Sequence, residues 1–243
     1  MQPAEYEKLD AVEGSHWWFF GLRANLASAL RRVVPQADGC LLDAGCGTGA
    51  TMRHFRAAFP RLHCVGMDAD EGACKVALDK SGCPVCAASV NQAPFRESSF
   101  DAIVSADVLC HSGVDVDAAL GSFHRILKPG GVLVLNLPAY RWMMSFHDRA
   151  VSTVQRFNRA QLRTWMRRAG YRDIRITYWN TLLFPLMVLH RKLGNQDASS
   201  DVRAVAAPLN TIFRGIMWIE NRLLRCGIML PFGGSVLVTA KRP

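Results

Sequence analysis

The stretch Leu41-Leu42-Asp43-Ala44-Gly45-Cys46-Gly47-Thr48-Gly49 decides the fold. Its apolar run leads into three glycines at alternate positions, which predicts a buried strand, a turn close to a ligand and a helix beginning near Ala50. Glycines allow positive φ and leave no Cβ in the way, and the free N–H groups of a helix N-terminus favour a polar or anionic group. The spacing is G-x-G-x-G after an acid, not the G-x-G-x-x-G of the dinucleotide fingerprint. The stretch therefore predicts a nucleotide-binding turn.

An acid follows this turn at an informative distance. The run from Leu62 to Asp68 reads as the next strand, and Asp68 ends it 19 residues after Gly49. In doubly wound folds an acid about 20 residues on accepts hydrogen bonds from the ribose hydroxyls of a nucleotide. We therefore expect Asp68 to bind a ribose and to repel a 2′-phosphate.

Strand and helix patterns alternate along most of the chain, which predicts a parallel sheet with helices on both faces and right-handed crossovers. Ligands of such sheets bind at the carboxyl ends of the strands, where the glycines and Asp68 fall. The expected strands are Cys40–Ala44, Leu62–Asp68, Val85–Ser89, Phe100–Ser105, Val132–Leu137, Tyr171–Trp179 and Ser235–Lys241. The expected helices include Ala50–Phe59, Glu71–Lys80, Asp115–Leu127, Ala160–Ala169 (capped by Asn158) and Leu209–Arg225.

Four motifs together resemble those of the class I S-adenosylmethionine-dependent methyltransferases. They occur in the family's order and spacing across residues 40–137: Leu42–Gly49, Val65–Asp68, Pro94-Phe95 with Ser99-Phe100-Asp101, and Ile126–Gly131. More loosely, His16-Trp17-Trp18-Phe19, Pro138-Ala139-Tyr140 and Asn180–Pro185 are similar to a bacterial small-molecule branch of types 11 and 12. The resemblance implies a Rossmann-like, seven-stranded, mostly parallel sheet whose antiparallel last strand lies beside the sixth. It also implies S-adenosylmethionine as cofactor and S-adenosylhomocysteine as product, and no motif requires a metal.

The resemblance also implies cofactor-binding positions. These are Asp43, Gly45, Cys46, Gly47, Gly49, Asp68, Ala69, Ser89, Val90 and Ala106. Family members usually hold adenine with an acid or amide after the third strand, whereas this chain has Ser89. After the fourth strand they usually have an acid followed by His, whereas this chain has Cys110 before His111.

Three residues are candidates for catalysis, namely His111, Tyr140 and His147. His111 stands beside the sulfonium in the family and would act as a general base, or would only shape the cofactor pocket by hydrogen bonding to backbone. Tyr140, His147 and the neighbouring Asp148 lie on a loop after the fifth strand, at the ligand edge of the sheet. The alternative for this loop is ordinary surface packing.

Length and composition favour one domain, since 243 residues of which half are hydrophobic bury a large core. We expect an N-terminal helical cap (1–35), a cofactor-binding core (36–179), a helical lid insertion (180–233) and the last strand (234–243). In the cap, Ser15 is a possible N-cap, and His16 and Trp17 either line the site or pack on the sheet edge. The lid leaves the sheet at its ligand edge.

The lid helix separates an apolar stripe from polar residues that include Glu220 and Asn221. Such a stripe beside a basic segment favours a lipophilic substrate or a membrane surface, and the alternative is packing on the core. The basic segment is 141–192, with 11 Arg and Lys against two acids, which accounts for the whole net charge of +9. No nucleic-acid module accompanies it, so nucleic acid is not expected as a partner.

Cysteine usage and the absence of a long apolar run predict a reducing, cytoplasmic location, and contact with a membrane surface is left open. The N-terminal segment is acidic, so no signal peptide is expected. The C-x-x-C of Cys83 and Cys86 lacks the second pair that a zinc site needs, so no metal is expected.

The favoured function is O-methylation of a lipophilic or carrier-linked small molecule, such as a secondary metabolite, lipid or glycan precursor. A homodimer or a partner protein remains open. The alternatives are a methyltransferase-like scaffold without turnover and a nicotinamide-dependent oxidoreductase, which lacks its motifs here.

Overall fold

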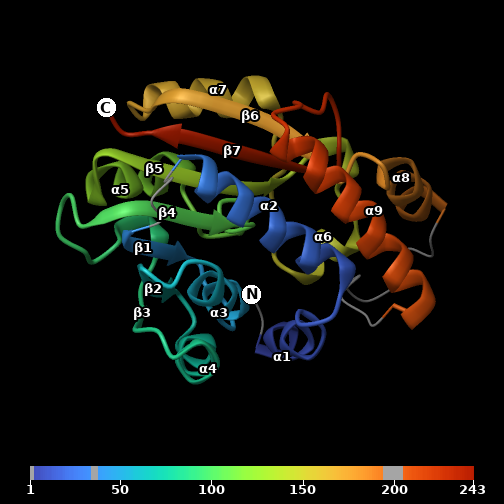
Figure 1. Cartoon of the computed structure of the whole chain (residues 1–243), viewed down its shortest axis with the longest axis horizontal. Helices are drawn as coiled ribbons and strands as arrows, with labels where there is room; N and C mark the ends of the chain where they lie inside the picture. The colour runs from blue at the N-terminus through green and yellow to red at the C-terminus, as the bar shows by residue number, and fades with distance from the viewer. Residues whose placement is uncertain (1–2, 34–37, 194–204) are drawn as a thin grey trace.

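A single seven-stranded sheet forms the centre of the molecule (Figure 1). The computed structural model describes residues 3–33, 38–193 and 205–243, with the side chains of 3–5, 146–147 and 192–193 left out. The strands are β1 (Gly39–Ala44), β2 (Leu62–Asp68), β3 (Val85–Ala87), β4 (Phe100–Ala106), β5 (Leu127–Pro138), β6 (Arg172–Trp179) and β7 (Ser235–Lys241). Their order is β3-β2-β1-β4-β5-β7-β6, and β7 runs antiparallel to both neighbours. The predicted Rossmann-like sheet with an antiparallel last strand is confirmed.

Helices cover both faces of this sheet because successive strand residues point to opposite sides. Leu41 packs with α2 (Trp17–Val33), α3 (Ala50–Ala58) and α9 (Ala207–Arg225), whereas Leu42 packs with α5 (Val116–Ile126) and α7 (Arg159–Arg168). The remaining helices are α1 (Pro3–Val12), α4 (Glu71–Ser81), α6 (Phe146–Ala150) and α8 (Phe184–Leu193), with short 3-10 turns η1 (Val90–Gln92) and η2 (Arg141–Met143). The core is therefore two apolar layers separated by the sheet.

Side-chain caps begin several helices, as their sequences predict. Asn158 accepts a hydrogen bond from the Gln161 amide at the start of α7, and Asp70 and Asp115 do the same for α4 and α5. The expectation for Ser15 is wrong. Its hydroxyl donates to the Val12 carbonyl at the end of α1, and His16 Nδ1 accepts the Trp18 amide at the start of α2.

The fifth strand begins earlier than the sequence predicts. Leu127 pairs with Phe100 across a bulge, so β5 starts there and includes the Lys128–Gly131 run that we expected to stop a helix. Gly130 adopts φ +77° and donates its amide to the Arg242 carbonyl. The Pro-Gly-Gly run therefore lies within an irregular first part of β5.

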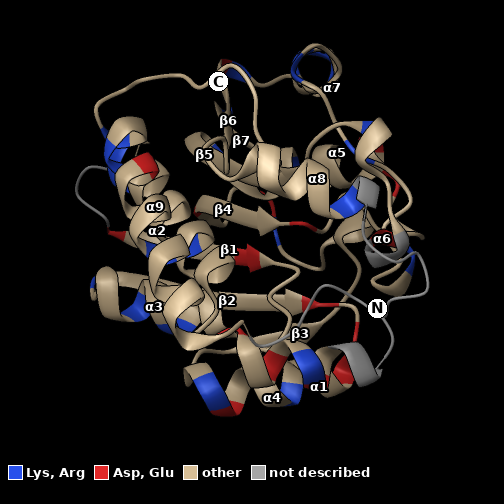
Figure 2. Cartoon of the chain, turned by 90° about the vertical axis from the view of Figure 1, so that its right-hand side faces the viewer, with Lys and Arg blue, Asp and Glu red and all other residues tan. Residues whose placement is uncertain are grey.

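The carboxyl ends of β1, β2 and β4 point toward α1, α6 and α8, whereas α9 lies beside α2 (Figure 2). On α9 the predicted polar side is wrong, because Glu220 and Asn221 are 1% and 5% exposed. The Glu220 carboxylate accepts backbone amides of residues 180–182, and Asn221 donates to Asn25 Oδ1 at 2.8 Å. These two polar residues thus fasten α9 to the β6–α8 turn and to α2. None of the helices in the described ranges combines the length and apolar character that a membrane crossing requires.

Candidate active site

A cavity of about 1040 Å³ opens at the carboxyl edge of the sheet. Its walls come from the glycine turn after β1, the ends of β2 and β4, and helices α1, α2, α8 and α9. Ligand pockets usually measure about 300–1,000 Å³. The cavity therefore has room for a nucleotide cofactor together with a second small molecule.

The glycine turn brings bare backbone to the cavity wall. Gly45 and Gly47 adopt φ +85° and +53°, which disfavours other residues. A Cβ on Gly45 would lie 2.1 Å from Val108 Cγ2. The amides of Gly45 and Cys46 donate to the Met67 carbonyl at 2.7 and 3.0 Å, which holds the turn against β2.

Asp68 lies at the end of β2, directly beside this turn. Its Oδ2 accepts the Gly47 amide at 2.9 Å, and its Oδ1 accepts the Asp70 amide and the Tyr6 hydroxyl, both at 3.1 Å. Burial and the Asp68 charge raise the pKa of Tyr6. The carboxylate is therefore fixed in orientation, and α1 lies over it.

Asp43 is the second acid at this edge and has an unpartnered oxygen. It is 3% exposed, and Oδ2 finds no hydrogen-bond donor in the part of the chain that the structure describes. Burial, followed by the nearby Asp68 and Glu13 charges, raises its pKa to about 7. A buried acceptor without a donor is unfavourable, so this oxygen suits a donor group of a ligand.

Most of the predicted cofactor positions line this cavity. They are Asp43, Gly45, Cys46, Gly47, Asp68, Ala69, Ser89, Val90 and Ala106. Gly49 is absent from the lining. A Cβ on Gly49 would lie 2.8 Å from Ala77 Cα, so this glycine serves the close packing of α3 on α4. Its predicted place in the cofactor site is corrected accordingly.

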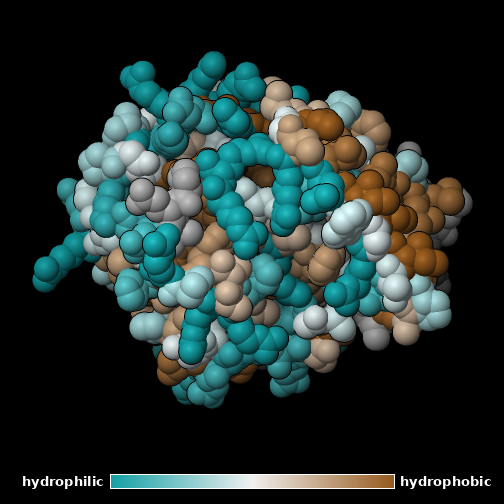
Figure 3. Space-filling model, viewed as in Figure 1, coloured by the Kyte–Doolittle hydropathy of each residue, from teal (hydrophilic) through white to brown (hydrophobic). Residues whose placement is uncertain are grey.

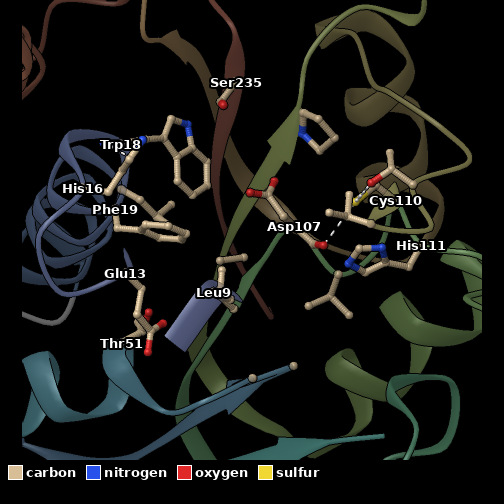
Figure 4. A pocket seen from close by; sticks show the side chains of 18 of the residues that line it. Leu9, Glu13, His16, Trp18, Phe19, Thr51, Asp107, Cys110, His111 and Ser235 are labelled. Atoms are coloured by element: carbon tan, nitrogen blue, oxygen red, sulfur yellow. Dashed lines mark hydrogen bonds between the residues drawn. The ribbon is translucent and has the colours of Figure 1, made fainter. Parts of the chain in front are cut away.

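Asp107 follows β4 and points its carboxyl group into the centre of the cavity (Figure 4). Asn136 Nδ2 donates to both of its oxygens at 3.1 Å, and Trp179 Nε1 donates to Asn136 Oδ1 at 2.7 Å. Burial raises the pKa of Asp107 to about 7, against the lowering effects of Arg156 and Asn136. Near neutral pH this carboxyl group is thus able to take up a proton.

His111 lies on the same wall as Asp107, across the cavity from Trp18 and Phe19 (Figure 4). Burial lowers the pKa of its imidazole, so the ring is neutral at pH 7. Its Nδ1 is buried without a hydrogen-bond partner among the described residues. A neutral imidazole with an unpartnered nitrogen is compatible with a general base. Hydrogen bonds to the backbone of Ser152 and Val151 are compatible with the alternative role of shaping the pocket, so both roles stay predictions.

The other two catalytic candidates have different outcomes. Tyr140 does not line the cavity, because its ring stacks on Tyr178 with centroids 5.2 Å apart and also contacts Phe184. The backbone at Tyr140 has φ +58°, and the side chain joins an aromatic cluster on β6 and α8. The side chain of His147 lies outside the described part of the chain. Tyr140 is therefore corrected from a catalytic to a packing residue.

Two neighbours of His111 stabilise the wall that carries it. The Cys110 thiol, which replaces the usual acid, donates to the Asp107 carbonyl at 3.1 Å, and burial raises its pKa. Asp148 is 1% exposed and pairs with Arg156, whose Nη2 lies 2.7 Å from Asp148 Oδ1. Both residues shape the site rather than present a reactive group to it.

Sequence reasoning missed Asp107, Tyr6 and Arg23, which all line the cavity. For Asp107 a signal existed, since it follows a strand at the ligand edge just as Asp68 does. Nothing in the sequence indicated Tyr6 and Arg23 as site residues, because the sequence does not specify where α1 and α2 pack relative to the sheet. His16 and Trp17 also line the cavity, and Trp17 packs against Phe213 of α9 as well.

Comparison with known proteins places this geometry in a family. A family model described as a methyltransferase domain matches residues 42–135. Malonyl-[acyl-carrier protein] O-methyltransferase of Dechloromonas aromatica (strain RCB) is 36% identical over 112 residues, covering 45% of this chain and 39% of that protein. Probable tRNA methyltransferase 9B of Homo sapiens is 32% identical over 144 residues, covering 58% and 30%.

Among solved structures, phosphoethanolamine N-methyltransferase 2 of Haemonchus contortus, in complex with S-adenosyl-L-methionine, has a TM-score of 0.61 at 20% identity. The alignment covers 90% of this chain and 52% of that one. The matched domain, these relatives and the shared fold support a class I S-adenosylmethionine-dependent methyltransferase. The chain spans about half or less of the length of each of these three proteins. The glycine turn, Asp68 and Asp107 lie within the matched region.

Proposed function

We propose that this protein transfers a methyl group from S-adenosylmethionine to an oxygen of a lipophilic or carrier-linked small molecule. The observation that carries the proposal is one cavity with two chemically distinct ends. The glycine turn, Asp43 and Asp68 form one end. Asp107 and His111 stand at the other, where a proton acceptor is needed.

The residues at the first end fit the cofactor. Asp68 presents a fixed carboxylate for the ribose hydroxyls, with Oδ2 holding only the Gly47 amide in the described structure. Asp43 Oδ2 has room for a donor, which suits a polar group of the cofactor. Gly47 leaves space for a close approach of the cofactor to the backbone, whereas the missing Cβ of Gly45 makes room for Val108. Bound there, S-adenosylmethionine supplies an already activated methyl group on a sulfonium.

The protein then has to hold an acceptor in line and take its proton. Asp107 is able to accept the proton through its carboxylate, and its orientation is held by Asn136. His111 offers a neutral imidazole on the same wall. Trp18 and Phe19 face them from α2 and limit the water that reaches the reacting atoms.

The remaining lining favours an apolar acceptor. Apolar side chains from the turn before α8, from α8 and from α9 line the cavity, namely Leu183, Leu186, Met187, Leu209 and Phe213. The acceptors named for the two similar proteins, a carrier-bound malonyl group and tRNA, differ widely, so relatives do not choose between them. We favour a small lipophilic acceptor because the apolar side chains of this wall outnumber its two polar ones, His190 and Arg191.

Calorimetric titration with S-adenosylmethionine and S-adenosylhomocysteine tests the cofactor half of the proposal. The Asp68→Ala variant should weaken both affinities about 100-fold, since hydrogen bonds to a charged group are worth about 1.5–3 kcal/mol each. Asp79→Ala, an exposed acid on α4, is the matched control and should bind like wild type. Absence of binding by wild type at about 1 mM ligand would refute the function.

Transfer of labelled methyl groups tests the acceptor half. Purified protein is incubated with labelled S-adenosylmethionine and, separately, a lipid extract, a carrier-protein mixture and bulk tRNA. We expect label in the lipid or carrier fraction, lost in Asp107→Asn. Label only in tRNA would replace the small-molecule acceptor, and cofactor binding without label in any fraction would favour the scaffold alternative.

A further inference from the structure

The outward side of α8 and of the turn before it is apolar. Leu182, Leu186 and Leu189 recur at helical spacing, and 50%, 50% and 54% of their surfaces are exposed. A helix on the surface of a soluble protein usually turns polar residues outward. Here the exposed stripe is apolar, although other residues of the same helix, such as Met187, already face the cavity.

Helix α9 extends this surface. Ile212, Trp218 and Ile219 are 58%, 56% and 49% exposed. The two segments adjoin, because the amide of Leu182 donates to Glu220 Oε2 at 3.1 Å. We call Leu182, Leu186, Leu189, Ile212, Trp218 and Ile219 the α8–α9 face. Figure 3 shows hydrophobic residues gathered over these two helices.

Aromatic rings continue the α8–α9 face on one side. Phe184 contacts Phe232 with centroids 5.8 Å apart and Trp142 with centroids 6.1 Å apart. Trp142 and Phe232 are 56% and 43% exposed. Exposed tryptophans beside an aliphatic surface are typical of groups that lie at a membrane–water interface.

Among the described residues, the exposed charges around the α8–α9 face are basic. Across the described residues of 141–150, 182–191 and 207–232, the two acids are Asp148 and Glu220, each 1% exposed. Both accept hydrogen bonds from the protein. The exposed titratable side chains of these ranges are Arg141, Arg149, His190, Arg214, Arg222 and Arg225. An apolar surface rimmed by arginines complements a surface that is apolar inside and negative at its edge.

We propose that the α8–α9 face docks on the surface of an anionic lipid bilayer. This orientation places α8 between the lipid and the cavity, since Leu186 and His190 lie on the cavity wall and are also exposed. If the proposed function holds, on which this step rests, a lipophilic acceptor enters along α8 without crossing water. The bilayer is thus both the docking partner and the source of the acceptor.

A second copy of the chain fits this surface less well. A two-fold contact through the α8–α9 face would bring the arginine rims of both copies together, and the described acids of these ranges are buried. An acidic carrier protein would match the arginines but would leave the broad aliphatic stripe unexplained. Both are outcomes that the experiment distinguishes.

Vesicle flotation with the full chain tests the docking. Wild type should float with vesicles of phosphatidylcholine and phosphatidylglycerol, and bind about tenfold less to phosphatidylcholine alone, since arginines contribute through anionic lipid. Leu189→Glu with Ile212→Glu should lower binding at least about tenfold. Leu78→Glu with Val76→Glu is the control, because these residues are 49% and 39% exposed on α4, outside the face.

Cofactor titration on the same samples separates the two proposals. The variants leave the cofactor end untouched, so their affinity for S-adenosylmethionine should equal that of wild type and shows that they fold. If wild type binds cofactor but not anionic vesicles, the docking proposal is overturned. It is also overturned if the α4 control loses as much vesicle binding as the face variant. The docking is also overturned if light scattering shows a wild-type dimer that dissociates only in the face variants. It is likewise overturned if the protein binds an acidic carrier protein without vesicles. Floating protein that binds no cofactor would instead refute the proposed function.

Discussion

Two regions border the cavity and are built in different ways. The cofactor edge comes from residues that are near neighbours in sequence, as the turn from Asp43 to Gly47 shows. The cover comes from α2, α8 and α9, which are distant in sequence. At the cofactor edge, Gly45 and Cys46 donate to the next strand through backbone amides. In the cover, buried polar side chains make the connections.

The cover depends on two such side chains in particular. The Glu220 carboxylate accepts three consecutive amides, of Asn180, Thr181 and Leu182, where β6 gives way to α8. Asn221, next in the chain, donates to Asn25 and Ser28 on α2. The difference teaches that a local turn forms the proposed cofactor end, whereas the proposed acceptor end depends on a few buried hydrogen bonds between distant segments.

The largest effect should follow from Glu220→Ala. The change leaves three buried amides without an acceptor, at about 1–3 kcal/mol each, so we expect the free energy of unfolding to fall by about 3 kcal/mol or more. Urea denaturation measures it. Glu97→Ala, an exposed acid, should change stability by less than about 0.5 kcal/mol. Equal stability of Glu220→Ala and wild type would show that the cover does not depend on this carboxylate.

Asp107→Asn should alter how stability depends on pH. The folded chain keeps the Asp107 proton up to about pH 7, whereas an unfolded aspartate loses it near pH 4, so this group makes stability fall as pH rises through that window and has no further effect above it. The variant should lose this part of the slope. Urea titrations between about pH 5 and 8 measure it, and Asp79→Asn serves as the exposed control. An unchanged slope would mean that Asp107 is ionised throughout.

Removing Asn221 should cost less than removing Glu220. Asn221→Ala and Asn25→Ala should each lower the free energy of unfolding by about 1–2 kcal/mol. In the double variant the losses should fall short of additivity by about 1 kcal/mol, because the two side chains share a hydrogen bond of 2.8 Å. A double-mutant cycle by urea unfolding checks this. If the two losses of stability are fully additive, the Asn221–Asn25 contact does not couple α9 to α2.

Tyr140→Phe should have the smallest effect. The ring keeps its stacking on Tyr178, and the hydroxyl lies outside the cavity lining, so methyl transfer should change by less than about threefold. His111→Asn is the contrast, with an expected loss of about 100-fold in kcat if the imidazole accepts a proton. A loss in Tyr140→Phe as large as that in His111→Asn would return Tyr140 to the catalytic residues.

The errors of sequence reasoning follow the same division. Around Asp43 and Asp68 the expected strands and turn agree with the structure, because alternation, glycines and acids each act over a few residues. On α9 the apolar spacing predicted an outward polar side that included Glu220 and Asn221, whereas both are buried. Periodicity records hydrophobicity alone, so a polar residue buried with partners is assigned to solvent.

The sequence by itself determined the sheet, the glycine turn and the position of Asp68 at the end of β2, and it indicated the methyltransferase resemblance, since each depends on local geometry that a short motif specifies. The tertiary structure decided which polar residues are buried and that Tyr140 packs on Tyr178 rather than facing the cavity. It also brought Asp107 and His111 to the same wall of the cavity. It also decided that an apolar side of α8 faces outward. These features depend on contacts between distant segments, whose partners and orientation no single stretch of sequence contains.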